Sequence, residues 1–141
     1  MFAKVQTIMQ IVEGFAPPKY AFETDNIGLQ VGNPNNRIGK VLVSLNVSRE
    51  VINEAIKNGC DMIVSHHPLI FDKLSTLRSD LHTGEIIRTL IKNDINVYCA
   101  HTNLDVTSGG VNDVLAKKLE LKSVQILQVT KNEQFKKIVV F

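Results

Sequence analysis

Hydrophobic residues recur along this 141-residue chain with two different periods, which predict where helices and strands lie. Over residues 5–14 the apolar side chains are three and four positions apart, so one face of a helix is apolar. The Pro17-Pro18 pair ends this helix. The same spacing predicts three more helices, over residues 49–58, 83–94 and 110–119.

Three continuous apolar runs predict buried strands, at residues 40–46, 61–65 and 95–100. Ser48 is expected to cap the helix between the first two, and Gly59 to close it. The Gly- and Asn-rich segment "DNIGLQVGNPNNRIG" adds a short strand between two loops. Because strands and helices alternate, the pattern predicts an α/β fold with a mostly parallel sheet flanked by helices.

The end of the chain departs from this alternation. Residues 123–141 predict one or two further strands and finish on the apolar run 138–141. A strand that ends in apolar residues leaves an edge that needs a partner, so we expect this chain to be a fragment of a longer protein.

Polar residues follow the three main strands at the points where those strands end. Asn46 ends the first strand, His66 and His67 follow the second, and His101 and Asp105 follow the third. In a parallel sheet these points lie on one edge, which is where open α/β sheets place their ligand sites. We therefore expect these side chains to converge.

The adjacent histidines suit metal binding. At a strand end the chain can turn both rings into one pocket, and Pro68 keeps His67 extended. Two neighbouring imidazoles do not easily chelate one small cation, but each can bind one of two cations about 3.5–4 Å apart. Asp105 would add a carboxylate to His66 and His67. These ligands suit two divalent ions of Zn, Mn, Fe or Ni better than Ca or Mg.

Other interpretations stay open for several of these residues. A His-His pair in an arbitrary sequence is more often exposed or hydrogen-bonded than metal-bound. His101 fits a ligand, a donor behind a ligand, or a catalytic proton shuttle. His82 precedes a helix alone and is expected to be structural or exposed, and Asp25 can simply shape a turn. Gly109-Gly110 opens a helix where a phosphate could bind.

Composition narrows the class of protein. The net charge is only +2 and the basic residues are scattered, which argues against nucleic acid as the main partner. No apolar run reaches the roughly 18 residues that a membrane span needs, and the N-terminus does not resemble a signal peptide. Cys60 and Cys99 are too far apart for a CxxC site, so reduced thiols in a cytoplasmic protein are expected.

Three motifs in this order and spacing resemble a known family: "DNIGLQVG" (25–32), "SHHPLIF" (65–71) and "AHTNLDVTSGGVND" (100–113). The chain is similar to the dinuclear-metal-centre proteins of the GTP cyclohydrolase I type 2-like family, over about residues 5–122. The resemblance implies that His66, His67 and Asp105 bind the metals. It also implies a homo-oligomer, a toroidal hexamer with the metal sites facing an inner cavity.

The sequence departs from that family's pattern in two respects. The family also uses a His-x-x-x-Glu pair from a distant C-terminal segment, and no such pair exists here. This absence implies a site that is only half built. The resemblance also implies that residues 1–130 are the metal-binding α/β part, one half of a two-part domain, and that residues 131–141 begin an inserted domain. Asn46 stands where many relatives carry Asp, although an Asn can still orient a ligand or a water.

Two functions follow as hypotheses from different classes. The first is a metal-dependent hydrolase that acts on a nucleotide, since the family name implies opening of the guanine ring of GTP by an activated water. His101 would be its catalytic proton shuttle. The second is a non-catalytic, ring-forming metal-binding scaffold or regulator, because a fold and a metal site do not fix a substrate.

Overall fold

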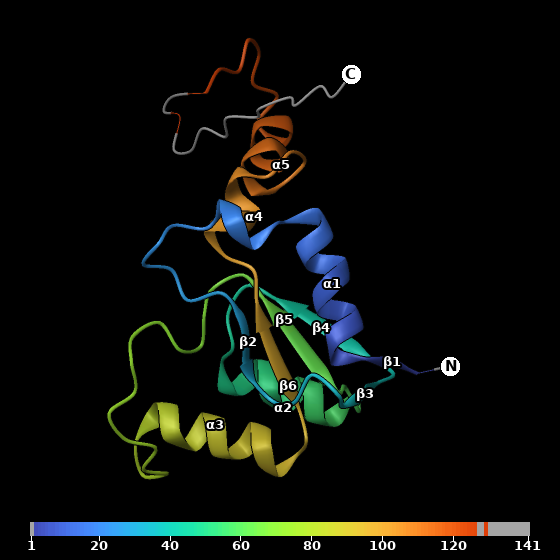
Figure 1. The fold of residues 1–141 in the computed structure, drawn as a ribbon, viewed down its shortest axis with the longest axis vertical. Helices are drawn as coiled ribbons and strands as arrows, with labels where there is room; N and C mark the ends of the chain where they lie inside the picture. Colours follow the sequence, from blue (N-terminus) through green and yellow to red (C-terminus); the bar gives the residue numbers. More distant parts are fainter. Residues whose placement is uncertain (1, 127–128, 130–141) are drawn as a thin grey trace, which may run out of the picture.

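A four-stranded sheet forms the centre of the computed structural model, which describes residues 2–126 and 129 (Figure 1). The strand order is β2-β6-β5-β4. Strands β4 (Val41–Ser44), β5 (Met62–Ser65) and β6 (Asn96–Cys99) are parallel, and β2 (Gly28–Val31) is antiparallel to β6. The predicted α/β fold with a mostly parallel sheet is confirmed. The antiparallel direction of β2 was not predicted.

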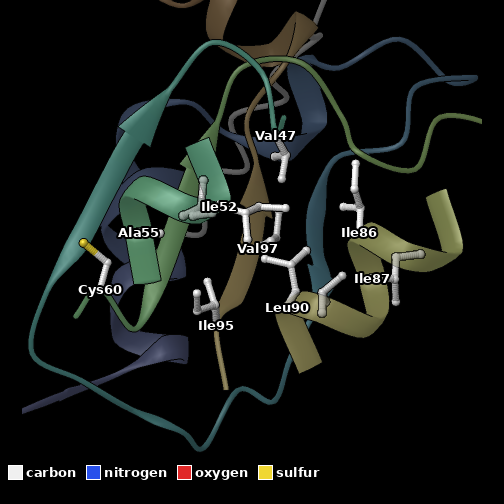
Figure 2. Close-up of a cluster of buried hydrophobic side chains, with 11 residues drawn as sticks. Val47, Ile52, Ala55, Cys60, Ile86, Ile87, Leu90, Ile95 and Val97 are labelled. Atoms are coloured by element: carbon white, nitrogen blue, oxygen red, sulfur yellow. The ribbon is translucent and has the colours of Figure 1, made fainter. Parts of the chain in front are cut away.

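Helices cover both faces of the sheet. On one face α2 (Arg49–Lys57) and α3 (His82–Lys92) pack on the buried cluster that Figure 2 shows. On the other face lies α1 (Val5–Phe15), which contributes Val5 to a second cluster. Successive strand residues alternate between the two clusters because side chains in a strand point to opposite faces. Ile63 and Val97 enter the first cluster, and Met62 and Tyr98 enter the second.

Local signals place the helix ends as expected. The Ser48 side chain accepts a hydrogen bond from the Val51 amide at 3.4 Å and so caps α2. Gly59 has φ +61°, the left-handed conformation that glycine favours after a helix. His82 is exposed and is the first residue of α3, so that helix begins one residue earlier than predicted.

Several short elements were not predicted. Strand β1 (Ala3–Lys4) pairs antiparallel with β3 (Arg37–Ile38), and η1 (Pro18–Tyr20) is a single 3₁₀ turn. The unpredicted helix α4 (Thr102–Val106) lies beyond the carboxyl ends of the strands and packs against α5 (Val111–Lys118) (Figure 1). These two helices extend the molecule beyond one end of the sheet.

Helix α5 confirms the predicted helix, but its apolar side chains stay partly exposed. Its apolar side chains occur at the predicted spacing, yet within the described residues α5 contributes no buried residue to either cluster. The exposed fractions of Val114 and Leu115 are 48% and 50%. Periodicity therefore predicted the helix correctly, although it does not say what covers the apolar face.

Three other predictions concern the C-terminal residues, membrane-spanning helices and the two cysteines. Most of the strands predicted in residues 123–141, and the domain boundary at residue 131, lie outside the described residues. None of the helices in the described part has both the length and the apolar character that crossing a bilayer requires. Cys60 and Cys99 are buried and unpaired, in agreement with the prediction of core thiols.

Candidate metal centre

Three histidines meet at the carboxyl ends of β5 and β6. His66, His67 and His101 each offer one ring nitrogen, and these three atoms all lie within 4.8 Å of one another. The ring centroids of His66 and His67 are 5.1 Å apart, and His101 lies 5.2 Å and 5.8 Å from them. The predicted convergence of these strand ends is confirmed.

Hydrogen bonds from the neighbouring strands fix the backbone of the histidine pair. The amides of His66 and His67 donate to the carbonyls of residues 44 and 45, at 3.1 Å and 2.8 Å. The carbonyl of His67 accepts from the Ser65 hydroxyl at 2.9 Å, and that of His66 accepts from the Cys99 thiol at 3.2 Å. Burial raises the pKa of Cys99 to about 12, so this thiol is a protonated donor and not a thiolate ligand.

The second ring nitrogen of each histidine faces an oxygen atom. The Nδ1 atoms of His66, His67 and His101 contact Ala100 O at 3.1 Å, Asn46 Oδ1 at 2.7 Å and Asp25 Oδ1 at 2.9 Å, respectively. The Ala100 carbonyl and the Asp25 carboxylate can only accept, so Nδ1 of His66 and of His101 carries the proton when the ring is neutral. His67 has the same tautomer while the amide oxygen of Asn46 faces it. Each Nε2 then keeps its lone pair, which is the form that binds a metal.

Helix α4 brings the carboxylate of Asp105 to this cluster. The Asp105 amide donates to the His101 carbonyl at 3.2 Å, so the two residues lie one helical turn apart on one side of the helix. Asp105 Oδ1 is 3.4 Å from His66 Nε2. The buried Asn103 anchors the turn, since its amide donates to the Ala16 carbonyl at 2.7 Å and its Oδ1 accepts from the His101 amide at 2.9 Å.

Sequence reasoning missed the role of Asp25. Its side chain is only 3% exposed. One carboxylate oxygen accepts from His101, and the other accepts from the Thr102 amide at 3.1 Å and from the Thr102 hydroxyl. Burial by itself would raise the pKa of Asp25, but the hydrogen bonds from Thr102 and His101 outweigh it and lower the pKa below its ordinary value. Asp25 is therefore an ionised acceptor.

Two other residues of the same Gly-rich segment hold the loop that follows the histidine pair. Gln30 Oε1 accepts from the amides of Leu69 and Ile70, at 2.7 Å and 3.1 Å. Gln30 Nε2 and Asn26 Nδ2 both donate to the Ile70 carbonyl, at 2.9 Å and 2.6 Å. The segment that begins at Asp25 thus braces both strand ends. The only signal in the sequence was that these polar residues belong to one motif.

The donor set fits a divalent transition metal. Neutral imidazole and carboxylate are ligands of Zn, Mn, Fe and Ni. Two nitrogens on one zinc ion lie at most about 4.2 Å apart, twice the Zn–N bond of about 2.1 Å. The spacing in the cluster therefore fits one ion after a small inward shift of the rings, and it equally fits two ions about 3.5–4 Å apart.

The glycine pair that was considered for phosphate binding has another partner. The Gly109 amide donates to Asp113 Oδ2 at 2.7 Å. This acidic side chain lies at the start of α5 and disfavours an anion there.

Comparison with known proteins gives the family of this chain. Residues 3–140 match the family Duf34/NIF3 (NGG1p interacting factor 3). The chain belongs to this family. It is 45% identical over 139 residues to the GTP cyclohydrolase 1 type 2 homolog of Halalkalibacterium halodurans, and the aligned region covers 99% of this chain and 37% of that protein. It is 47% identical over 136 residues to the protein of the same name from Bacillus subtilis, covering 96% and 36%.

Two solved structures show the same fold. A Bacillus cereus protein related to NIF3 superposes with a TM-score of 0.89 at 44% identity, over 93% of this chain and 36% of that chain. Reduced HcgD from Methanocaldococcus jannaschii superposes with a TM-score of 0.80 at 40% identity, over 87% and 49%. The chain thus spans a little over a third of the length of its curated relatives.

Proposed function

We propose that the protein is a divalent-metal-dependent hydrolase with a dinuclear centre, in which His66, His67 and Asp105 are ligands. The observation that carries this proposal is that three imidazoles, each hydrogen-bonded through Nδ1, offer ring nitrogens that lie within 4.8 Å of one another. Two bound ions would supply an activated water at neutral pH and a polarising charge for an electrophile.

The protein's own residues have distinct tasks in this proposal. The strand-end backbone contacts hold His66 and His67 in place, so that little ring ordering is needed on binding. Asp105 places a negative charge beside His66, and such a charge compensates a bound cation. His101 Nδ1 donates to Asp25, which directs the opposite nitrogen into the centre.

The position of His101 suits either of two roles, that of a proton carrier or that of a further metal ligand. Replacement of His101 by Ala separates them. A proton carrier predicts unchanged metal content with a lower rate and a changed pH profile, because the substitution removes a general acid or base. A ligand predicts a loss of bound metal.

GTP is the first substrate to test. Support comes from the names of the relatives, which are called GTP cyclohydrolase 1 type 2 homologs. Purified protein would be assayed with GTP and a panel of phosphate esters, with and without a chelator. Turnover that the chelator abolishes and added metal restores supports the hydrolase. No chelator-sensitive turnover on any substrate would leave the alternative, a non-catalytic metal-binding protein.

The ligand assignment is tested by the double variant His66→Ala and Asp105→Ala. We expect bound metal to fall well below the content of the unaltered protein, as measured by elemental analysis after gel filtration. His82→Ala is the matched control, since His82 is exposed and lies outside the cluster. An unchanged metal content in the double variant would refute the assignment.

A homo-oligomer, and in particular a hexameric ring, is also proposed. The half-exposed apolar side chains of Val114 and Leu115 on α5 support association, because such side chains are commonly covered in an interface. Light scattering coupled to gel filtration would measure the mass in solution. A purely monomeric mass would contradict this part of the proposal.

A further inference from the structure

We propose that Asp25 and Asn46 are positioning residues of unequal strength: Asp25 locks His101 in its metal-binding tautomer, whereas Asn46 leaves His67 able to switch. This inference rests on the proposed metal site and takes His101 in the second of its two roles, as a further ligand. It goes beyond that site because it assigns an order to the ligands. Nε2 of His101 would always be unprotonated and able to bind a metal ion. Nε2 of His67 would be so only while Asn46 presents its amide oxygen to Nδ1.

The contacts of Asp25 leave a single arrangement. Its Oδ2 faces the Thr102 amide at 3.1 Å, and a backbone amide can only donate. Its Oδ1 faces His101 Nδ1 at 2.9 Å, and a carboxylate can only accept. His101 must therefore carry its proton on Nδ1 when the ring is neutral. The side chain is 3% exposed, so water does not compete for these bonds.

The same contacts predict what Asp25→Asn would do. The amide oxygen must take the Oδ2 position, because the Thr102 amide needs an acceptor there. The NH₂ group then faces His101 Nδ1 and donates to it. His101 would move its proton to Nε2, which could no longer bind a metal. A nearly isosteric change would thus reverse the tautomer and leave the surrounding packing in place.

Asn46 lacks this constraint. Its Oδ1 contacts His67 Nδ1 at 2.7 Å, but within the described part of the chain no protein group bonds its Nδ2. Asn46 and His67 are both exposed, so water can satisfy either end of the amide. If the amide turns over, its NH₂ donates to Nδ1 and His67 becomes the Nε2-protonated form. Asn46→Asp would remove this alternative, because both carboxylate oxygens accept.

The test measures tautomers in the metal-free protein, independently of metal binding. Long-range ¹⁵N–¹H correlation spectra distinguish Nδ1-protonated from Nε2-protonated imidazoles, and the His signals are assigned with single His→Gln variants. We expect a pure Nδ1–H form for His101 in the unaltered protein and an Nε2–H form in Asp25→Asn. We expect a mixture for His67 that becomes a pure Nδ1–H form in Asn46→Asp.

Thr102→Ala is the matched control. It removes the hydroxyl that contacts Asp25 but keeps the amide that orients the carboxylate, so the His101 tautomer should not change. If Asp25→Asn fails to fold, the spectrum of the unaltered protein still decides, since a His101 protonated on Nε2 would overturn the proposal. An unreversed tautomer in folded Asp25→Asn would also overturn it.

Zinc affinity, measured by competition with a chromophoric chelator, gives the second readout. We expect Asp25→Asn to weaken binding about 10–100-fold, the usual effect of losing an orienting partner, and Asn46→Asp to strengthen it about tenfold. An added charge alone would strengthen binding without changing the His67 tautomer, and that outcome would count against the proposal. If no variant binds zinc but the tautomers are as predicted, the proposed metal site fails while the positioning roles stand.

Discussion

The two ends of the sheet are both rich in polar side chains, but they use them in opposite ways. At the amino ends of β5 and β6, Asn96 Oδ1 accepts from the Asn33 amide and from Asn36 Nδ2, both at 3.1 Å, and Asn96 Nδ2 donates to the Asp61 carbonyl at 2.9 Å. Asp61 Oδ2 accepts from the amides of residues 39 and 40. All of these polar atoms hold the fold together.

At the carboxyl ends the polar atoms are only half used. The Nδ1 atoms of the three histidines are hydrogen-bonded, whereas within the described residues their Nε2 atoms have no hydrogen bond, although that of His66 faces Asp105 Oδ1 at 3.4 Å. A cavity of about 390 Å³ lies at the amino end, lined in part by Asn33, Asn36 and Asn96, and its central amide is already saturated. The difference teaches that a binding site is marked by potential ligand atoms that have no hydrogen bond, and not by polarity or cavity volume.

The largest effect on folding is expected from Gly32→Ala at the amino end. Gly32 has φ +114°, and an added Cβ would lie 2.0 Å from Asn96 Oδ1. Backbone strain and overpacking together should lower the free energy of unfolding by roughly 2–5 kcal/mol. Urea denaturation would measure it, and the zinc affinity of the folded molecules should not change.

Gly59→Ala is the matched control for this prediction. Gly59 also has a positive φ, +61°, but no atom lies within 4 Å of an added Cβ. Only the backbone cost of roughly 1–2 kcal/mol should remain. Equal costs at both positions would show that the contact with Asn96 is not important.

A smaller loss is expected from Asn96→Ala. This side chain is 1% exposed, and its removal leaves the Asn33 amide without its acceptor and takes one of two donors from the Asp61 carbonyl. The free energy of unfolding should fall by about 2 kcal/mol. Asn46→Ala, at the exposed opposite end, should change it by less than about 0.5 kcal/mol. If Asn46→Ala proves as costly, the contrast between the two ends is wrong.

The smallest effect on folding, with a clear effect on metal, is expected from His67→Ala. Because His67 is exposed, its loss should change the free energy of unfolding by less than about 0.5 kcal/mol. Zinc affinity in a chelator competition should fall at least about tenfold, since a ligand is lost. The same fall in His82→Ala would mean that the histidines of the cluster have no special role.

The sequence predicted the parts of the molecule that depend on local pattern. The ends of β5 and β6 follow from apolar runs, and the polar residues after them had to share one edge. Helix α4 was missed because its five residues carry no amphipathic repeat. The role of Asp25 depends on its contact with His101, a residue 76 positions further along the chain, and hydrophobic periodicity does not reveal such a contact.

Two other features depend on what lies around an element and not on its own residues. Apolar spacing predicted α5 as a helix but did not show that its apolar face remains partly exposed within the described residues. Asn96 and Asn46 likewise resemble each other in sequence, one beginning and one following a strand. Only their contacts show that the amide of Asn96 is saturated while that of Asn46 orients His67.

The histidine cluster at the carboxyl edge of the sheet should bind a metal ion through its imidazoles. X-ray absorption at the zinc edge of the zinc-loaded protein detects this binding, because imidazole ligands give a characteristic multiple-scattering pattern. We expect nitrogen ligands at about 2.0–2.1 Å with that pattern, which weakens as His66 and His67 are replaced in turn. A shell without imidazole, or one unchanged by both replacements, would refute the metal site.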